Sequence, residues 1–196
     1  MRALWLSIGL LLAMLSGCAV GPSLPPDLND YEGYVERLDA APLWPTYAID
    51  GYTRRLRLTL GPPFVGQAAS IRIDIPERGQ PVGYAVRTRL GVHGRKITQR
   101  HRFAPKPGEL EQLDELIEAA DVWQFERGSW QMDPEGGKNV ICIDGVQLIF
   151  ERATKEGYRF SEANAQCTAS YKLLRVAEQM ITMAGLEKSG VDSWIY

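Results

Sequence analysis

Two acidic side chains beside a turn are the first residues that could do acid–base chemistry. Asp144 and Glu151 lie seven positions apart, on the two sides of Gly145 and a short apolar run. A paired-carboxylate site needs two such groups held within several ångströms of each other in different environments. Asp144 has a simpler explanation, because tight turns favour Asp directly before Gly. We therefore predict no catalytic role for this pair.

The two histidines and one glycine-rich stretch offer no stronger site. His93 lies between Gly91 and Gly94 in a predicted turn, and His101 lies among arginines that repel a charged general acid. No Gly-x-Ser-x-Gly nucleophile turn occurs. Residues 136–139 read Gly-Gly-Lys-Asn, without the spacing or hydroxyl of a phosphate loop, and calcium-loop spacing is also missing. The sequence predicts no enzyme active site, no cofactor and no metal site.

The first 18 residues have the order of an export signal. Arg2 precedes an apolar run of about a dozen residues, which is too short to span a bilayer. Leu15-Ser16-Gly17-Cys18 resembles the lipobox of bacterial lipoproteins, which implies cleavage before Cys18 and a lipid on that cysteine. Ala19 implies, by the same resemblance, the outer membrane, with the protein facing the periplasm. The alternative is an ordinary signal peptide that contains a cysteine.

Cys142 and Cys167 are the two cysteines that remain after Cys18. An exported protein meets an oxidising compartment, where an even pair of cysteines favours a disulfide. This bridge would close a loop of about 25 residues and stabilise the fold by about 3 kcal/mol in the chain-entropy model. The alternative is two buried free thiols. No metal site is predicted from this pair, because both histidines are distant in sequence.

These features divide the chain into three predicted segments. Residues 1–17 form the signal peptide, and residues 18–45, rich in Pro, Gly, Asp and Asn, form a tether and an N-terminal segment. Residues 46–196 form the folded part. The 179 residues from Cys18 onward suffice for one ordinary domain with a hydrophobic core.

Positive charge is concentrated in the middle of the chain. Between Arg54 and Lys106, ten arginines and two lysines accompany only two acidic residues, Asp74 and Glu77. From residue 107 onward, sixteen acidic residues accompany eight basic ones. Arginine favours planar, bidentate contacts with carboxylates and phosphates. This asymmetry indicates an anion-binding or partner-binding surface, or a surface neutralised within the fold by acidic segments.

The basic region has the periodicity of strands. Apolar and polar residues alternate around positions 54–60, 71–75, 84–90 and 97–103, and Gly- and Pro-containing breaks separate the four runs. We predict an antiparallel meander with one aliphatic face. The opposite face is predicted to collect the arginines proposed for anion or partner binding: Arg55, Arg57, Arg72, Arg87, Arg89, Arg100 and Arg102.

The second half of the chain mixes helices and strands. Residues 109–121 have a helical apolar spacing with an acidic outer face, and residues 164–186 give the longest helical pattern. Residues 140–143 and 146–151 flank Asp144-Gly145 as a predicted hairpin, with a third strand at 157–160. The predicted fold class is α+β: a single domain with an antiparallel meander, two main helices and one disulfide. The acidic helix at 109–121 is the predicted alternative partner of the arginines.

The order of motifs in this half also carries a resemblance. Ile143-Asp144-Gly145, Phe150-Glu151-Arg152 and Gly157-Tyr158, followed by Cys167 and a long helix, resemble uncharacterised exported proteobacterial domains. The resemblance covers residues 109–186. It implies no activity.

Together these features predict a lipid-anchored envelope protein that binds a periplasmic protein partner without catalysis, in an accessory, inhibitory or immunity-type role. The first alternative is a structural component that contacts peptidoglycan or lipopolysaccharide through its arginines. The second is a hydrolytic enzyme, which the missing triad, metal cluster and nucleotide loop disfavour. Nucleic acid is excluded as a partner by the compartment. The sequence leaves the oligomeric state open.

Overall fold

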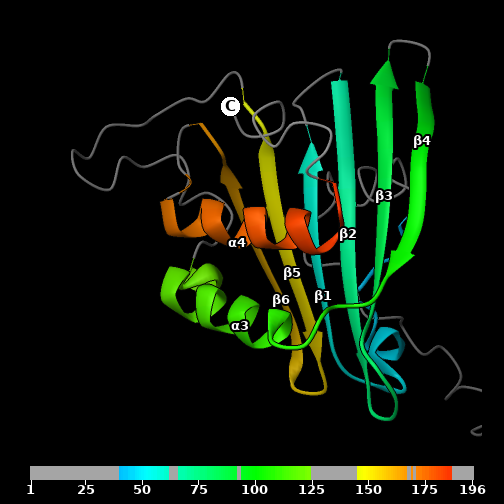
Figure 1. Ribbon diagram of the computed structural model, residues 1–196, viewed down its shortest axis with the longest axis vertical. Coiled ribbons are helices and arrows are strands. Elements are labelled where there is room, and N and C mark those ends of the chain that lie inside the picture. Colours follow the sequence, from blue (N-terminus) through cyan, green and yellow to red (C-terminus); the bar gives the residue numbers. More distant parts are fainter. Residues whose placement is uncertain are drawn as a thin grey trace, which may run out of the picture.

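One antiparallel sheet and two helices make up the fold in the computed structural model (Figure 1), which describes residues 40–61, 66–91, 94–124, 145–166, 169 and 171–186. The six strands are β1 (Tyr52–Gly61), β2 (Gly66–Pro76), β3 (Val82–Gly91), β4 (Gly94–Phe103), β5 (Gln147–Thr154) and β6 (Gly157–Asn164). The helices are α3 (Glu109–Ala120) and α4 (Tyr171–Met183), with 3-10 turns η2 (Thr46–Ile49) and η3 (Val122–Gln124).

The strand order is β4-β3-β2-β1-β5-β6, and all neighbours are antiparallel. Strands β1 to β4 form the meander that the alternation predicted. The β5–β6 hairpin adds to the other side of β1, so segments nearly 90 residues apart in sequence become neighbours. The predicted α+β class, with one antiparallel sheet and two main helices, is confirmed.

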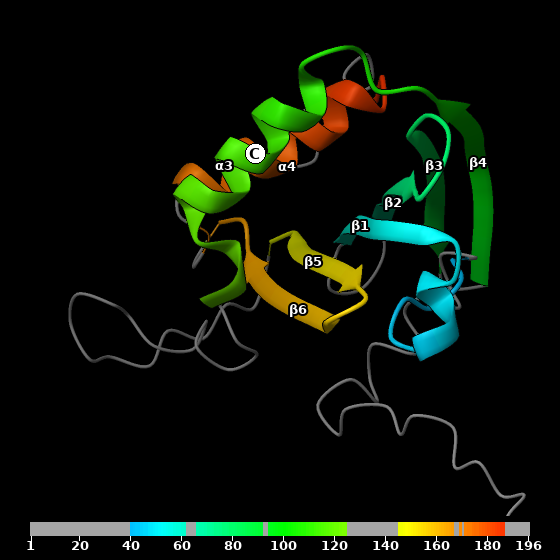
Figure 2. The ribbon, with the colours of Figure 1, turned by 90° about the horizontal axis from the view of Figure 1, so that it is seen from below.

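The two faces of the sheet have different partners. The helix face carries Leu56, Leu58 and Ile73, which pack against α3 and α4. The opposite side, called here the far face, carries Arg55 and Arg57. Figure 2 shows α3 and α4 on one side of the sheet and the segment with η2 on the other. The core therefore lies between sheet and helices, while residues 40–50 cover part of the far face.

Both helices form because their apolar residues recur at helical spacing. In α3, Leu113, Ile117 and Ala120 are buried against the core, while Glu111 faces solvent. In α4, the buried set is larger: Leu173, Val176, Ala177, Met180, Ile181 and Met183. The residues that flank α3, Gly108 before it and Asp121 after it, both have left-handed backbone conformations, with φ of 84° and 50°.

The long C-terminal helix begins later than its pattern predicted. Strand β6 continues to Asn164, which pairs with Gln147 on β5, and α4 begins only at Tyr171. Asn164 is buried, and its side-chain oxygen accepts a hydrogen bond from the amide of Gln166 at 3.0 Å. This side-chain turn is a local alternative to helical hydrogen bonding and ends the strand. The predicted strand at 140–143 lies outside the described residues.

Candidate functional site

The far face carries one row of polar side chains across the sheet. The strand register places Glu151 beside Arg57, Arg57 beside Arg72, Arg72 beside Tyr84, and Tyr84 beside Arg102. We call these five residues the arginine row. They come from β5, β1, β2, β3 and β4 in that order, so only the complete sheet brings them together.

The inner end of the row is a buried ion pair. Arg57 and Glu151 are each 1 % exposed. The guanidinium contacts both carboxylate oxygens, with Nη2 donating to Oε1 at 2.6 Å, and the Tyr158 hydroxyl donates to Oε1 at 2.9 Å. Arg57 Nη1 donates to the carbonyl of Ala41 at 2.7 Å. A buried charge pair is tolerable because these extra hydrogen bonds satisfy its donors and acceptors.

A second carboxylate next to the row is shared by two arginines. Arg55 donates from Nε to Asp74 Oδ1 at 2.8 Å and from Nη1 to the carbonyl of Ala48 at 2.6 Å. Arg72 approaches the same Oδ1 with its Nε at 3.1 Å, without the alignment of a hydrogen bond. Burial lowers the pKa of Arg72, Asp74 counteracts that shift, and the positive charges of Arg55 and Arg57 lower it further.

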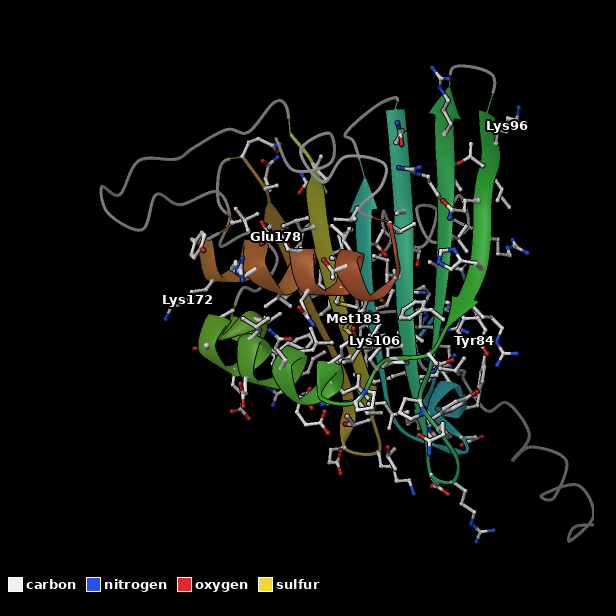
Figure 3. The ribbon with its side chains drawn as sticks, viewed as in Figure 1. Tyr84, Lys96, Lys106, Lys172, Glu178 and Met183 are labelled. Atoms are coloured by element: carbon white, nitrogen blue, oxygen red, sulfur yellow. The ribbon has the colours of Figure 1, made fainter. Side chains whose placement is uncertain are left out.

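The outer end of the row opens to solvent. The guanidinium carbon of Arg72 lies 4.6 Å from the centroid of the Tyr84 ring, and that of Arg102 lies 5.4 Å from it. Both distances are within the range of cation–π contacts. Arg102 is exposed, and Tyr84 and Arg72 are half-buried. Figure 3 shows Tyr84 and Lys96 at opposite ends of the β3–β4 hairpin. The row therefore runs from a neutralised, buried end to a charged, accessible one.

The prediction that seven arginines share one face is wrong for two of them. Arg87 lies opposite Ala69, and Arg89 lies opposite Gln67, which places both on the helix face. The reason is that Gly83 and Ala85 take the core-facing positions of β3, although their neighbours Tyr84 and Val86 are larger and more apolar. Burial lowers the pKa of Arg87, while Arg89 is exposed.

Arg55 and Arg57 are also unsuited to the binding role predicted for them. They are 8 % and 1 % exposed, and their donors are used within the chain. Arg100 and Arg102 lie on the far face and are exposed, as the pattern predicted. On the far face, the predicted binding residues that remain accessible in part or in full are Arg72, Arg100 and Arg102.

The acidic helix does not neutralise the arginine row. Helix α3 packs on the helix face, where Asp114 pairs with Arg54 at 2.7 Å. The carboxylates that contact the row are Asp74 and Glu151, and sequence reasoning had assigned neither to the arginines. A signal was available, because Asp74 has the same strand parity as Arg72, and Glu151 is the single acid within the apolar strand 147–154. Tyr84 and Tyr158 were missed as well.

The other sequence-derived candidates have structural explanations where they are described. Both oxygens of Glu151 are used by Arg57, so no substrate can reach them. His101 bonds through Nε2 to the carbonyl of Ala184 at 2.7 Å, and therefore links β4 to the end of α4. A carbonyl can only accept, so this nitrogen carries the proton. Several predicted features lie outside the described residues: Cys18, His93, residues 136–139, Cys142, Asp144 and Cys167.

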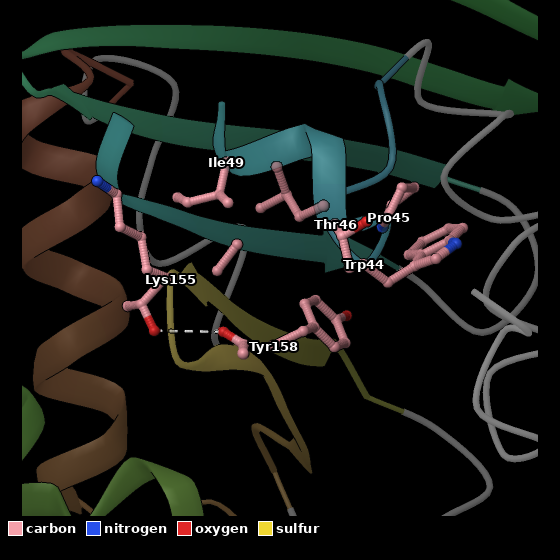
Figure 4. A pocket seen from close by; sticks show the side chains of 10 residues that line it. Trp44, Pro45, Thr46, Ile49, Lys155 and Tyr158 are labelled. Atoms are coloured by element: carbon pink, nitrogen blue, oxygen red, sulfur yellow. Dashed lines mark hydrogen bonds between the residues drawn. The ribbon is translucent and has the colours of Figure 1, made fainter. Parts of the chain in front are cut away.

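Two of the hollows in the described surface adjoin the sheet. One, of about 100 Å³, lies between residues 43–49 and the β5–β6 turn, with Trp44, Lys155 and Tyr158 in its wall (Figure 4). That volume is well below the 300–1,000 Å³ typical of ligand pockets. The other, of about 350 Å³, is an open groove in which Arg152 stacks on Trp123 at 4.9 Å. In the part of the chain that the structure describes, no three His, Cys, Asp or Glu side chains meet in a metal-binding group.

No protein-family model matches the chain, and no curated protein matches it either. Neither helix in the described ranges has the length and apolar composition needed to cross a bilayer. The site therefore has to be interpreted from its own chemistry. Its described groups can hold an anion through arginine donors at the outer end of the row.

Proposed function

We propose that this chain is a lipid-anchored envelope protein that binds an anionic partner in the periplasm and does not act as an enzyme. The partner surface is the basic hairpin, defined as strands β3 and β4. Its exposed basic side chains are Arg89 and Lys96 on the helix face and Arg100 and Arg102 on the far face. A protein partner is the first form of this proposal, with an accessory, inhibitory or immunity-type role.

The observation that carries the proposal is the charge of this hairpin. No acidic residue occurs between Glu77 and Glu109, while eight basic residues do. The described ion pairs of arginines in the sheet join Arg54, Arg55, Arg57 and Arg72 to carboxylates that lie on neither β3 nor β4. A basic edge strand also discourages edge-to-edge aggregation. Protection of the edge explains the charges on β4, but it does not require Arg89 on β3 or Arg72 on β2.

The lipid anchor is supported by the lipobox at Leu15-Ser16-Gly17-Cys18. An anchor at Cys18 would keep the basic hairpin at the membrane surface, within reach of envelope proteins and of anionic envelope polymers. Contact with lipopolysaccharide or peptidoglycan is the second form of the proposal. It is favoured by the excess of arginine over lysine, because guanidinium groups match phosphate and carboxylate geometry.

A fractionation and crosslinking experiment tests the anchor and the binding surface together. Cys18→Ser should move the protein from the outer-membrane fraction to the soluble periplasm. Arg89→Glu with Lys96→Glu should leave the protein folded, since both side chains are exposed, and should abolish recovery of crosslinked envelope partners. The matched control exchanges the same two charges as Arg89→Lys with Lys96→Arg and should recover them normally. Unchanged partitioning of the serine variant, or unchanged recovery by the acidic variant, contradicts the corresponding half of the proposal.

We also propose a disulfide between Cys142 and Cys167. The support is the exported compartment and the even number of cysteines after Cys18. Peptide mass mapping without reduction tests it, and the energetic consequence is argued in the Discussion.

A further inference from the structure

The charges of the arginine row and of the Arg55–Asp74 pair beside it do not balance. Four guanidinium groups, from Arg55, Arg57, Arg72 and Arg102, meet two carboxylates, from Asp74 and Glu151. Glu151 is used by Arg57, and Asp74 is held by two hydrogen bonds from Arg55. These six residues therefore carry a net charge of +2, and Arg72, which shares Asp74 with Arg55, and Arg102 lie on the two strands that flank Tyr84.

The outer end of the row brings two guanidinium groups to one tyrosine ring. Their carbons lie 4.6 and 5.4 Å from the Tyr84 centroid, and they approach it from the two neighbouring strands. The ring holds Arg72 in place from one side, and Asp74 approaches it from the strand itself. Arg102 is exposed and can turn toward a ligand. The buried Nε of Arg72 has no aligned acceptor, which leaves this arginine incompletely satisfied.

We propose that Arg72 and Arg102 bind a phosphate monoester group beside Tyr84. This inference rests on the proposed binding function and gives the chemistry of its ligand. A phosphate monoester carries a charge of about −1.5 to −2 at pH 7, which matches the net charge of this cluster. A phosphodiester or a carboxylate carries one negative charge and leaves one arginine uncompensated. Two guanidinium groups can also offer paired N–H donors to separate phosphate oxygens.

Inorganic phosphate is the probe for the first experiment. The full chain, purified in detergent, is titrated with phosphate by calorimetry at low ionic strength and pH 7.5. One phosphate should bind per chain. Binding should weaken at pH 5, because the second phosphate ionisation has a pKa of about 6 and the dianion is lost below it. Arg102→Gln should weaken binding at least tenfold, and Arg102→Lys should weaken it less, because lysine keeps the charge but loses the planar donor pair.

The matched control is Arg78→Gln, which removes an exposed arginine between β2 and β3, outside the basic hairpin. This variant should keep its phosphate affinity within about twofold, since it lies outside the proposed site. Equal weakening by Arg78→Gln and Arg102→Gln would mean a diffuse positive field and would overturn the proposal. Absence of phosphate binding by the folded wild-type chain would overturn it as well. Arg102 is exposed, so its variants test the site even where Arg72→Gln does not fold.

Two further probes distinguish the source of the phosphate group. Glucose 6-phosphate represents a phosphorylated sugar, and dihexanoyl phosphatidic acid represents a phosphomonoester lipid. Dihexanoyl phosphatidylglycerol is the phosphodiester control and should bind at least tenfold more weakly than phosphatidic acid; equal affinity would overturn the monoester assignment. If phosphate does not bind while Arg89→Glu with Lys96→Glu still loses the envelope partner, the phosphate site fails and the proposed function stands.

Discussion

Arg57 and Arg72 are direct cross-strand partners. Arg57 also lies directly opposite a carboxylate, that of Glu151, whereas Arg72 does not. Like charges directly opposite each other on a sheet are unfavourable. The molecule tolerates the contact at the inner end because Glu151, Tyr158 and a backbone carbonyl surround Arg57. Burial is the main cause that lowers the pKa of Arg72, and the positive charges of Arg55 and Arg57 lower it further. The two arginines should therefore differ in their effect on stability.

The first prediction compares Arg57→Met with Arg72→Met. Loss of Arg57 leaves the Glu151 carboxylate buried without its cation, so the free energy of unfolding should fall by about 3–5 kcal/mol. Loss of Arg72 removes a desolvated, repelled charge, while Asp74 keeps Arg55. The free energy of unfolding should then stay within about 1 kcal/mol of the wild type, or rise. Urea unfolding at pH 7 measures both values.

A double variant sharpens this comparison. Arg57→Met with Glu151→Leu removes both charges and should recover most of the stability lost in Arg57→Met, because no unpaired ion remains buried. If Arg57→Met and Arg72→Met lowered the free energy of unfolding equally, the proposed difference between a stabilising Arg57 and a non-stabilising Arg72 would be wrong. Retention of Arg72 at no benefit to stability agrees with a binding role, since functional residues often cost stability.

At this scale the sequence predicted the polar parity of Arg55, Arg57 and Arg72 correctly. It could not predict which of them is buried. That depends on Glu151, which reaches Arg57 from 94 positions away in the chain, and on residues 40–50, whose carbonyls accept from both buried arginines. No local pattern carries such long-range partners.

Strand β3 shows why the alternation of side chains in a sequence can assign the wrong face of a strand to the core. Tyr84, Val86 and Thr88 look like the core side, yet Gly83 and Ala85 face the helices. A Cβ at Gly83 would lie 2.1 Å from the Phe103 ring on β4, so any larger residue there must displace that ring. The aromatic ring fills the volume that a β3 side chain would otherwise occupy.

The second prediction follows from this packing. Gly83→Ala should lower the free energy of unfolding by about 1–3 kcal/mol, because the added methyl group must displace the Phe103 ring. Gly83→Ala with Phe103→Leu should lose less than the two single changes combined, since the smaller side chain leaves room for the methyl group. Thermal unfolding of all four proteins measures this coupling. Strict additivity would show that the ring does not oppose a side chain at position 83.

Elements that depend on local periodicity were predicted correctly, whereas those that depend on contacts distant in sequence were not. The four-strand meander and α3 follow from local periodicity and were predicted correctly. The start of α4 was placed too early because residues 164–170 include good helix formers, whereas the pairing of Asn164 with Gln147 extends β6. The pairing of β5 with β1 was not predicted, because it joins segments that are distant in sequence; β5 has β1 on one side and β6 on the other.

At the scale of the whole molecule, the sheet joins two separate parts of the chain. The meander β1–β4 and the hairpin β5–β6 meet along a single strand pair, β1 with β5. The buried Arg57–Glu151 pair crosses that same junction. Positive charge lies on the side of the meander distant from this junction, and acidic residues dominate the second half of the chain. A binding partner on the basic hairpin would thus approach the sheet at the end opposite to β6.

The last prediction concerns a covalent closure within the second part of the chain. Cys142 precedes β5 by five residues, and Cys167 follows β6 by three, so a disulfide between them would close the chain around the β5–β6 hairpin. Closing a loop of about 25 residues restricts the unfolded chain, and removal should cost about 2–5 kcal/mol. Cys142→Ala with Cys167→Ala should lower the urea midpoint accordingly. Reduction with dithiothreitol should lower it only in the wild type. Two alkylatable thiols in freshly purified native protein would instead mean buried free cysteines, and the double variant would then lose only the packing of two small side chains.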